Sequence, residues 1–254
     1  LPNLRAILSI AAGCDHLLAD PQLPAQLPIV RMVDDYLAAM MAEYAVYAVL
    51  HFHRDMDDYR AEQLQGVWNR RWPLYTPETD VGILGLGAIG ADCAGKLLAM
   101  GFRVHGWSRS PKAIEGVICH AGEAGLLEML GRCRYLVCVL PLTDETQGIV
   151  NARTLAAMPE GSYLINIARG GHVVDADLLA ALDGGHIAGA FLDVFNDEPL
   201  PPEHPYWHHP KVWMTPHVAG ELVPRSCAKA VAATIRRDQA GEPLLHLLDK
   251  ERGY

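Results

Sequence analysis

The sequence predicts an α/β protein whose core is a doubly wound parallel sheet. A short apolar run at residues 81–84 leads directly into a glycine-rich turn at 85–90, and a helix-forming stretch follows that turn. From there on, apolar runs and helix-forming stretches alternate along the chain. Parallel strands need such helical crossovers, and proteins of this class bind ligands at the carboxyl ends of their strands.

The N-terminal third is expected to hold two short strands and one long helix. A strand is predicted at 4–10, followed by a small-residue turn at 11–16 whose backbone amides are suited to a ligand, and a second strand at 29–33. Asp34 or Asp35 can cap a helix that continues to about His53 with apolar residues almost all round. We expect that helix to be buried and place it at or near the interface of a homodimer.

The remaining elements follow in regular order. Residues 65–77, with two tryptophans, are predicted to be a surface connection. Strands are predicted at 81–86, 102–108, 135–140, 162–168, 187–194 and 212–215. Helices are predicted at 89–100, 122–130, 151–158 and 175–183, and a final helix at about 224–240 follows a proline-rich loop.

The composition excludes several classes of function. The 254 residues are half hydrophobic, which is enough for one large or two medium domains. A formal net charge of −9 argues against nucleic-acid binding, and no apolar run has the length of a membrane span. The six cysteines show neither a C-x-x-C pair nor a disulfide spacing, so we expect free thiols in a cytoplasmic protein without a metal site. The chain opens without methionine, and we expect that it was cut from a longer protein.

The glycine turn has the G-x-G-x-x-G spacing of a dinucleotide fingerprint. Gly85 permits the sharp turn, Gly87 leaves room for a pyrophosphate, and Gly90 lets the helix pack closely on the strand. The first N–H groups of the helix and its dipole then face the phosphates. A purely structural turn is the alternative, but the strand–turn–helix–strand context favours a Rossmann dinucleotide site. The cofactor contacts predicted in this turn are Gly85, Leu86, Gly87, Ala88, Ile89 and Gly90.

The turn after the second of these strands indicates which dinucleotide is preferred. NAD-binding folds carry Asp or Glu about 20 residues beyond the glycines, whereas this chain has Ser108, Arg109, Ser110 and Lys112. Hydroxyl, guanidinium and ammonium groups can all donate to a 2′-phosphate, and no carboxylate in this turn repels it. We therefore predict NADP(H) as the preferred cofactor and NAD(H) as a possible one; a solvated basic turn is the alternative.

Three polar residues follow the ends of late strands, where a doubly wound fold places its active site. They are Arg169, Glu198 and His217, and each alone could be an ordinary loop residue. Together they suit the reduction of a 2-oxo acid, since arginine can bind the carboxylate and histidine can protonate the carbonyl oxygen. A carboxylate hydrogen-bonded to that histidine favours its protonated form.

At this point the chain resembles the D-isomer-specific 2-hydroxyacid dehydrogenases over nearly its whole length. The matching motifs are Gly85-x-Gly87-x-x-Gly90, Leu140-Pro141-Leu142-Thr143, Asn166-x-Ala168-Arg169-Gly170, Asp193-x-Phe195-x-x-Glu198-Pro199 and Thr215-Pro216-His217. The stretches at 9–16 and 107–112 are most similar to the A-type glyoxylate/hydroxypyruvate reductases.

The resemblance implies roles for the candidate residues. Arg169 would bind the substrate, helped by backbone at Ala12 and Gly13, while Glu198 would orient His217, the acid/base. Further cofactor contacts implied by the resemblance are Leu140, Pro141, Thr146, Ala168, Asp193 and His217. Residues 1–33 would be part of an N-terminally incomplete flavodoxin-like substrate domain, 34–222 the nucleotide domain, and 223–254 a helix returning to the substrate domain.

The leading hypothesis is a cytoplasmic, homodimeric reductase that transfers a hydride from NADPH to glyoxylate or hydroxypyruvate. One alternative is an NAD-dependent relative acting on another 2-hydroxy acid. The other is a non-catalytic, nucleotide-sensing protein of the same fold. Neither nucleic acid nor membrane is expected as a partner.

Overall fold

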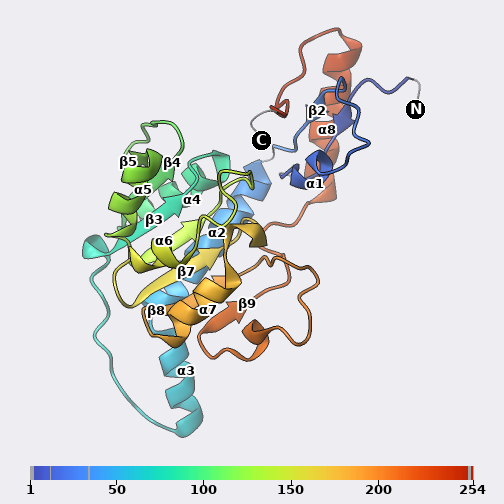
Figure 1. The fold of residues 1–254 in the computed structure, drawn as a ribbon. Helices are drawn as coiled ribbons and strands as arrows, with labels where there is room; N and C mark the ends of the chain where they lie inside the picture. The colour runs from blue at the N-terminus through green and yellow to red at the C-terminus, as the bar shows by residue number, and fades with distance from the viewer. Residues whose placement is uncertain (1–2, 12, 34, 251–252, 254) are drawn as a thin grey trace.

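The computed structural model describes residues 3–11, 13–33, 35–250 and 253, which form two lobes of unequal size (Figure 1). The larger lobe is a parallel sheet with helices on both faces. The smaller lobe combines the first two described strands with the last long helix, so segments from the first and last parts of the described chain lie together (Figure 1). In the described ranges, no helix has both the length and the apolarity needed to cross a membrane.

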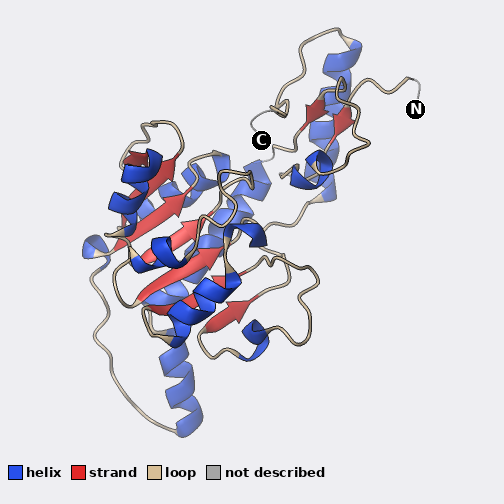
Figure 2. Ribbon diagram, in the orientation of Figure 1, coloured by secondary structure: helices blue, strands red, loops and turns tan. Residues whose placement is uncertain are grey.

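Seven parallel strands form the sheet of the larger lobe in the order β5-β4-β3-β6-β7-β8-β9 (Figure 2). The strands are β3 (Asp80–Leu84), β4 (Arg103–Ser108), β5 (Ile118–Ala121), β6 (Tyr135–Cys138), β7 (Ser162–Asn166), β8 (Ile187–Leu192) and β9 (Val212–Met214). The chain adds strands first to one side of β3 and then to the other, so the order reverses between β3 and β6. Ligands of doubly wound folds bind at such a reversal.

Helices cover both faces of this sheet. On one face lie α2 (Asp35–His53) and α4 (Ala88–Ala99), whose buried residues share a core with β3, β6 and β7. On the other lie α5 (Gly122–Leu130), α6 (Ala152–Ala156) and α7 (Asp175–Asp183), packed on a second core. Because parallel strands are covered on both sides, they are almost continuously apolar, as expected for this class.

The smaller lobe joins the start and end of the described chain. Strands β1 (Ile7–Leu8) and β2 (Ile29–Val30) pair in parallel, and α1 (Asp15–Leu18) lies between them in sequence. Helix α8 (Pro224–Gln239) packs alongside, and its Asp238 pairs with Arg5. The segment after α8 bonds to β2, because Leu248 N–H donates to Ile29 O at 2.8 Å.

An arm projects from the larger lobe at the end away from the chain termini (Figure 1). It consists of α3 (Met56–Gln65) and the extended segment 66–75, which leads back to the body through a 3₁₀ turn at Thr76–Glu78. Two further 3₁₀ turns, at Gly170–His172 and Pro205–His208, lie in connections of the larger lobe.

Every strand and helix predicted from residue 81 onward is present. Five of the six predicted strands continue too far at their carboxyl ends, whereas the strand predicted at 102–108 ends at Ser108 as expected. The chain leaves the sheet at Leu84, Cys138 and Asn166, so the next apolar residues turn toward a cleft instead of pairing. The predicted strands 4–10 and 29–33 are wrong in length, because β1 and β2 pair over only two residues each.

Three elements were not predicted: α1, α3 and β5. The sequence of α3 is polar on all sides and lacks an apolar stripe, whereas β5 is a four-residue edge strand with a cysteine and a histidine. The long helix is found at Asp35–His53 as expected, but α4 and β7 cover most of its apolar side chains within the chain. Burial within the chain thus accounts for much of the apolar character of α2, and its place at or near a subunit interface stays a prediction.

Candidate active site

A cleft of about 710 Å³ lies at the carboxyl ends of β3, β4, β6 and β7. The glycine turn forms its floor, the turn after β4 and the 141–146 turn form its walls, and the smaller lobe closes one end. Most of the sequence-predicted site residues line it: Gly13, Gly85, Leu86, Gly87, Ala88, Ile89, Gly90, Ser108, Arg109, Ser110, Lys112, Leu140, Pro141, Thr146, Ala168 and Arg169.

The three glycines of the turn have the geometry expected from their spacing. Gly85 has φ +103°, a conformation that favours glycine, and leads the chain from β3 toward α4. A Cβ on Gly90 would lie 1.8 Å from Gly85 O, so only glycine allows this approach of helix to strand. A Cβ on Gly87 would meet nothing within 4 Å, which leaves open space above the first N–H groups of α4.

The basic turn after β4 is tied to both neighbouring turns. Lys112 Nζ donates to Leu86 O at 2.6 Å, which fastens the turn to the glycine loop. Arg109 pairs with Glu145 at 2.9 Å, which fastens it to the 141–146 turn. Ser108 Oγ donates to Ser110 O at 2.8 Å. The four predicted donors are thus gathered at one wall of the cleft, with Glu145 as a carboxylate that was not predicted.

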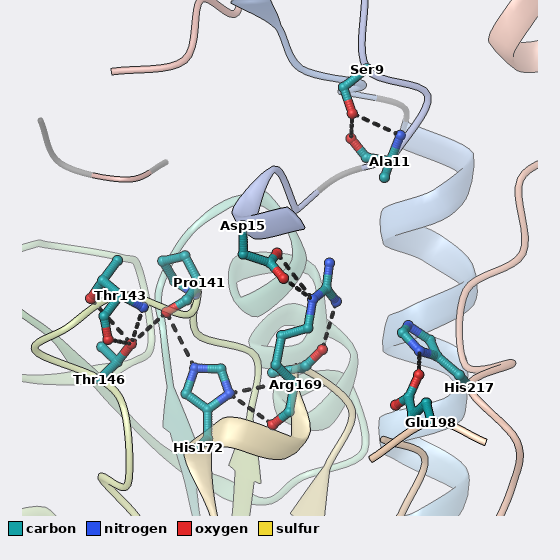
Figure 3. Close-up of polar contacts among 11 residues, drawn as sticks. Ser9, Ala11, Asp15, Pro141, Thr143, Thr146, Arg169, His172, Glu198 and His217 are labelled. Atoms are coloured by element: carbon teal, nitrogen blue, oxygen red, sulfur yellow. Dashed lines mark hydrogen bonds and ion pairs between the residues drawn. The ribbon is translucent and has the colours of Figure 1, made fainter. Parts of the chain in front are cut away.

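A buried histidine connects the turns that follow β6 and β7. His172 is fully buried, and burial lowers its pKa, so the ring is neutral. Its Nε2 donates to Pro141 O at 3.2 Å, and its Nδ1 accepts the Arg169 N–H at 3.3 Å (Figure 3). On the same turn, Thr146 Oγ1 donates to Pro141 O at 2.7 Å.

Arg169 follows the end of β7, and its side chain points toward the smaller lobe (Figure 3). Its Nε donates to the Asp15 carboxylate at 3.2 Å, and its Nη1 donates to Ala168 O at 2.7 Å. Gly13 lies directly against the guanidinium, because a Cβ there would be 2.1 Å from Nη2. The predicted pair of Gly13 and Arg169 is therefore together, while Ala12 lies outside the described residues.

His217 and Glu198 form the third polar group, on the other side of Arg169 from Asp15 in the view of Figure 3. His217 Nδ1 donates to Glu198 Oε2 at 2.7 Å, and Glu198 Oε1 accepts the Phe195 N–H at 2.9 Å. The hydrogen bond at Nδ1 leaves Nε2 of the half-exposed imidazole as the atom available to a substrate.

Asp193 anchors the loop that carries His217. Its Oδ1 accepts the Val218 N–H and its Oδ2 accepts the Ala219 N–H, both at 2.8 Å. Thr215 Oγ1 also donates to Oδ1 at 2.5 Å. His217 itself has φ +57°, a conformation uncommon outside glycine, and these bonds hold it there. Asp193 is thus turned toward this loop, and its contact with the cofactor remains a prediction.

Three site residues were missed in the sequence: Asp15, Glu145 and His172. Each acts through a partner that is distant in the chain or through backbone atoms, so no local spacing marks it. For Asp15 the only signal was a carboxylate two positions after Gly13 in the turn expected to face a ligand. In the part of the chain that the structure describes, no three His, Cys, Asp or Glu side chains form a group that could hold a metal ion.

Comparison with known proteins gives consistent matches. Residues 46–219 match the family model for the NAD-binding domain of D-isomer specific 2-hydroxyacid dehydrogenases. Glyoxylate/hydroxypyruvate reductase A of Salmonella heidelberg (strain SL476) is 44% identical over 258 aligned positions, covering 99% of this chain and 82% of the relative.

Two crystal structures show the same likeness. A D-isomer specific 2-hydroxyacid dehydrogenase from Xanthobacter autotrophicus Py2, solved with NADPH and MES, has a TM-score of 0.96 at 44% identity over 100% of this chain and 80% of its own. An NADPH-dependent glyoxylate/hydroxypyruvate reductase from Sinorhizobium meliloti, solved with NADP and sulfate, has a TM-score of 0.94 at 42% identity over 100% and 81%.

Proposed function

We propose that this chain, which belongs to the D-isomer-specific 2-hydroxyacid dehydrogenase family, reduces glyoxylate and hydroxypyruvate with NADPH. The observation that carries the proposal is Arg169 in the lining of the cleft at the strand ends, with the Glu198–His217 pair on its other side from Asp15 in the view of Figure 3. The names of the relatives support the choice of substrates, and the NADPH or NADP in their crystal structures supports the choice of cofactor.

The residues of the cleft fit NADPH. Open space at Gly87, next to the start of α4, suits a pyrophosphate, which the helix dipole also favours. The donors of Arg109, Ser110 and Lys112 suit a 2′-phosphate, and Ser108 joins them when its hydroxyl turns away from Ser110 O. When bound, NADPH supplies the hydride that is added to the carbonyl carbon of the substrate.

The chain's own groups complete the reaction. Arg169 binds the substrate carboxylate through its remaining N–H groups, with Gly13 leaving it room. His217 gives the proton to the carbonyl oxygen, so that C=O becomes CH–OH, and Glu198 fixes the ring at Nδ1. Asp193 holds the loop on which His217 lies.

Steady-state kinetics tests this function. We expect NADPH oxidation that depends on glyoxylate or hydroxypyruvate, with a higher kcat/KM for NADPH than for NADH. Absence of oxidation with both substrates and both cofactors contradicts the proposal. If the same assays give a higher kcat/KM for another 2-oxo acid, the proposed reaction stands and the proposed substrate changes.

We also propose a homodimer in which the arm contacts the second copy. Trp68 and Trp72 of the arm are 94% and 92% exposed, an unusual state for two indoles so close in sequence. Light scattering at micromolar concentration should give twice the mass of one chain. In the double variant Trp68→Ser with Trp72→Ser, the measured mass should fall to that of a single chain. Trp207→Ser, which changes an exposed tryptophan outside the arm, is the control. A parent protein of single-chain mass contradicts the proposal.

We make two further proposals, on the roles of the two lobes and on the cellular location of the protein. We propose that residues 34–222 bind the nucleotide and that 1–33 and 223–254 belong to the substrate lobe; the separate core around Ile29 and Leu248 supports this. We further propose a reducing, cytoplasmic location, supported by six cysteines that are all free.

A further inference from the structure

We propose that Asp15 is a positioning residue that orients Arg169 for the substrate carboxylate. This inference deepens the proposed function and rests on it for the role of Arg169. Asp15 belongs to α1 in the smaller lobe, and Arg169 follows β7 in the larger one, so the contact joins the two lobes at the cleft (Figure 3).

The ion pair occupies one edge of the guanidinium only. Both carboxylate oxygens of Asp15 lie on Nε, at 3.2 and 3.3 Å, and Nη1 donates to Ala168 O at 2.7 Å. An arginine has five N–H groups, and these bonds use one on Nε and one on Nη1. Nη2 and the second N–H of Nη1 remain as the end-on fork that a carboxylate binds with two parallel bonds.

The space around this fork is also defined by the smaller lobe. Gly13 lies against Nη2, where a Cβ would come within 2.1 Å, so the guanidinium passes directly over its backbone. Asp15 comes two residues later, and the same Cβ would lie 2.8 Å from its Oδ1. One turn therefore provides both the clearance for Arg169 and the carboxylate that sets its rotation.

Two effects of Asp15 on an anionic substrate oppose each other. Its charge repels the substrate, but the pair is partly open to solvent, with side-chain exposures of 27% and 31%, so this repulsion is screened. Without Asp15, the long arginine side chain must be ordered by the substrate itself, at a cost in rotamer entropy. Because Asp15 lies on the Nε edge and leaves the end-on fork to the substrate, we infer that orientation outweighs repulsion.

Variants at position 15 separate the two effects. Asp15→Ala should raise the KM for glyoxylate on the order of tenfold, the range for a lost hydrogen bond to a charged group, with a smaller change in kcat. Asp15→Asn keeps an oxygen that can accept from Nε and should recover most of the affinity. Asp20→Asn removes a charge from the same segment, where Asp20 accepts the Gln22 N–H, and should leave KM unchanged.

A double variant tests whether Asp15 acts through Arg169. With Arg169→Lys as background, which lacks Nε and the planar fork, Asp15→Ala should cause no further rise in KM. A full additional tenfold rise would mean that Asp15 acts elsewhere and would overturn the inference. A KM that falls or stays constant in Asp15→Ala alone would also overturn it, since repulsion would then dominate.

Binding of oxamate separates failure of this inference from failure of the proposed function. Calorimetry with the parent chain and NADP⁺ should give a dissociation constant that rises in Asp15→Ala by the same factor as KM. If oxamate responds in this way but glyoxylate and hydroxypyruvate are not reduced, the inference holds and the proposed function falls. If the parent chain does not bind oxamate, the inference falls.

Discussion

At the scale of the residue, His217 has the most direct role in the proposed reaction. It is held at Nδ1 by Glu198 and at its backbone by Asp193, so its Nε2 is presented to the substrate. His217→Ala should lower kcat by about 10²–10⁴-fold, the usual contribution of a positioned acid/base. The dissociation constant for NADPH, from fluorescence titration, should stay within a few-fold of the parent value. Turnover close to that of the parent would exclude His217 as the proton donor.

The second residue-scale prediction concerns cofactor choice. Ser108→Asp combined with Arg109→Ala adds a charge that repels a 2′-phosphate and removes one that attracts it. The removal also releases Glu145 from its 2.9 Å ion pair, which adds to the repulsion. The ratio of kcat/KM for NADPH to that for NADH should fall from above one to below one. Arg237→Ala, which breaks a similar exposed pair between α8 and Glu242 beyond the end of that helix, is the control and should not change the ratio.

At the scale of the element, the glycines of the β3–α4 turn should respond differently to the same added methyl group. Gly90→Ala forces helix and strand apart and should lower the free energy of unfolding by about 1–3 kcal/mol, as overpacking does. Gly87→Ala has space and should change that free energy by less than about 1 kcal/mol, while it weakens NADPH binding roughly tenfold or more. Urea titration and fluorescence titration measure the two effects. Equal NADPH affinity in Gly87→Ala and the parent would contradict the assigned phosphate site.

The elements also show why most of the fold could be predicted from the sequence. Each buried parallel strand needs a continuous apolar run, and each helix over it needs an apolar stripe, so both leave local patterns. β5 and α3 lack these patterns because β5 lies at the sheet edge and α3 projects into solvent. The position of β5 depends on tertiary contacts with β4, which a local pattern does not encode.

The candidate site was predictable where its chemistry follows a strand end. Arg169 and His217 lie just past β7 and β9, and the glycine turn follows β3, so spacing alone indicated them. Asp15 and Glu145 pair with arginines that are 154 and 36 residues away in sequence. Nothing in one sequence relates such pairs, and only the folded chain brings them together.

At the scale of the whole molecule, buried histidines predict how stability depends on pH. Burial lowers the pKa of His53, His120 and His172 below the ordinary value of 6.5, with a further contribution from Arg54 to His53 and from His105 to His120. The unfolded chain therefore binds protons that the folded chain does not. The contribution of the three neutral histidines to the free energy of unfolding is complete above pH 6.5. It is lost as the pH falls from 6.5 toward the pKa values that these histidines have in the folded state.

Urea titrations at fixed protein concentration should show this loss. The midpoint should be similar at pH 8 and pH 7 and should fall steadily between about pH 6.5 and pH 5. His172→Gln, which keeps a hydrogen-bonding side chain but cannot titrate, should have a shallower decline. A midpoint independent of pH over this range would mean that the three rings are protonated equally in both states.

The pairing of the chain's two ends sets an order for folding during synthesis on the ribosome. β2 is completed by backbone bonds from residues 246–248, so the smaller lobe must wait until nearly the whole described chain has been translated. The strands whose carboxyl ends form the cleft, β3, β4, β6 and β7, are finished at residue 166. Although nascent chains usually fold from the N-terminus, here the middle of the polypeptide can fold first. Arg169 is therefore translated well before residues 246–248, and the lobe that carries Asp15 completes its backbone bonds after the nucleotide cleft can form.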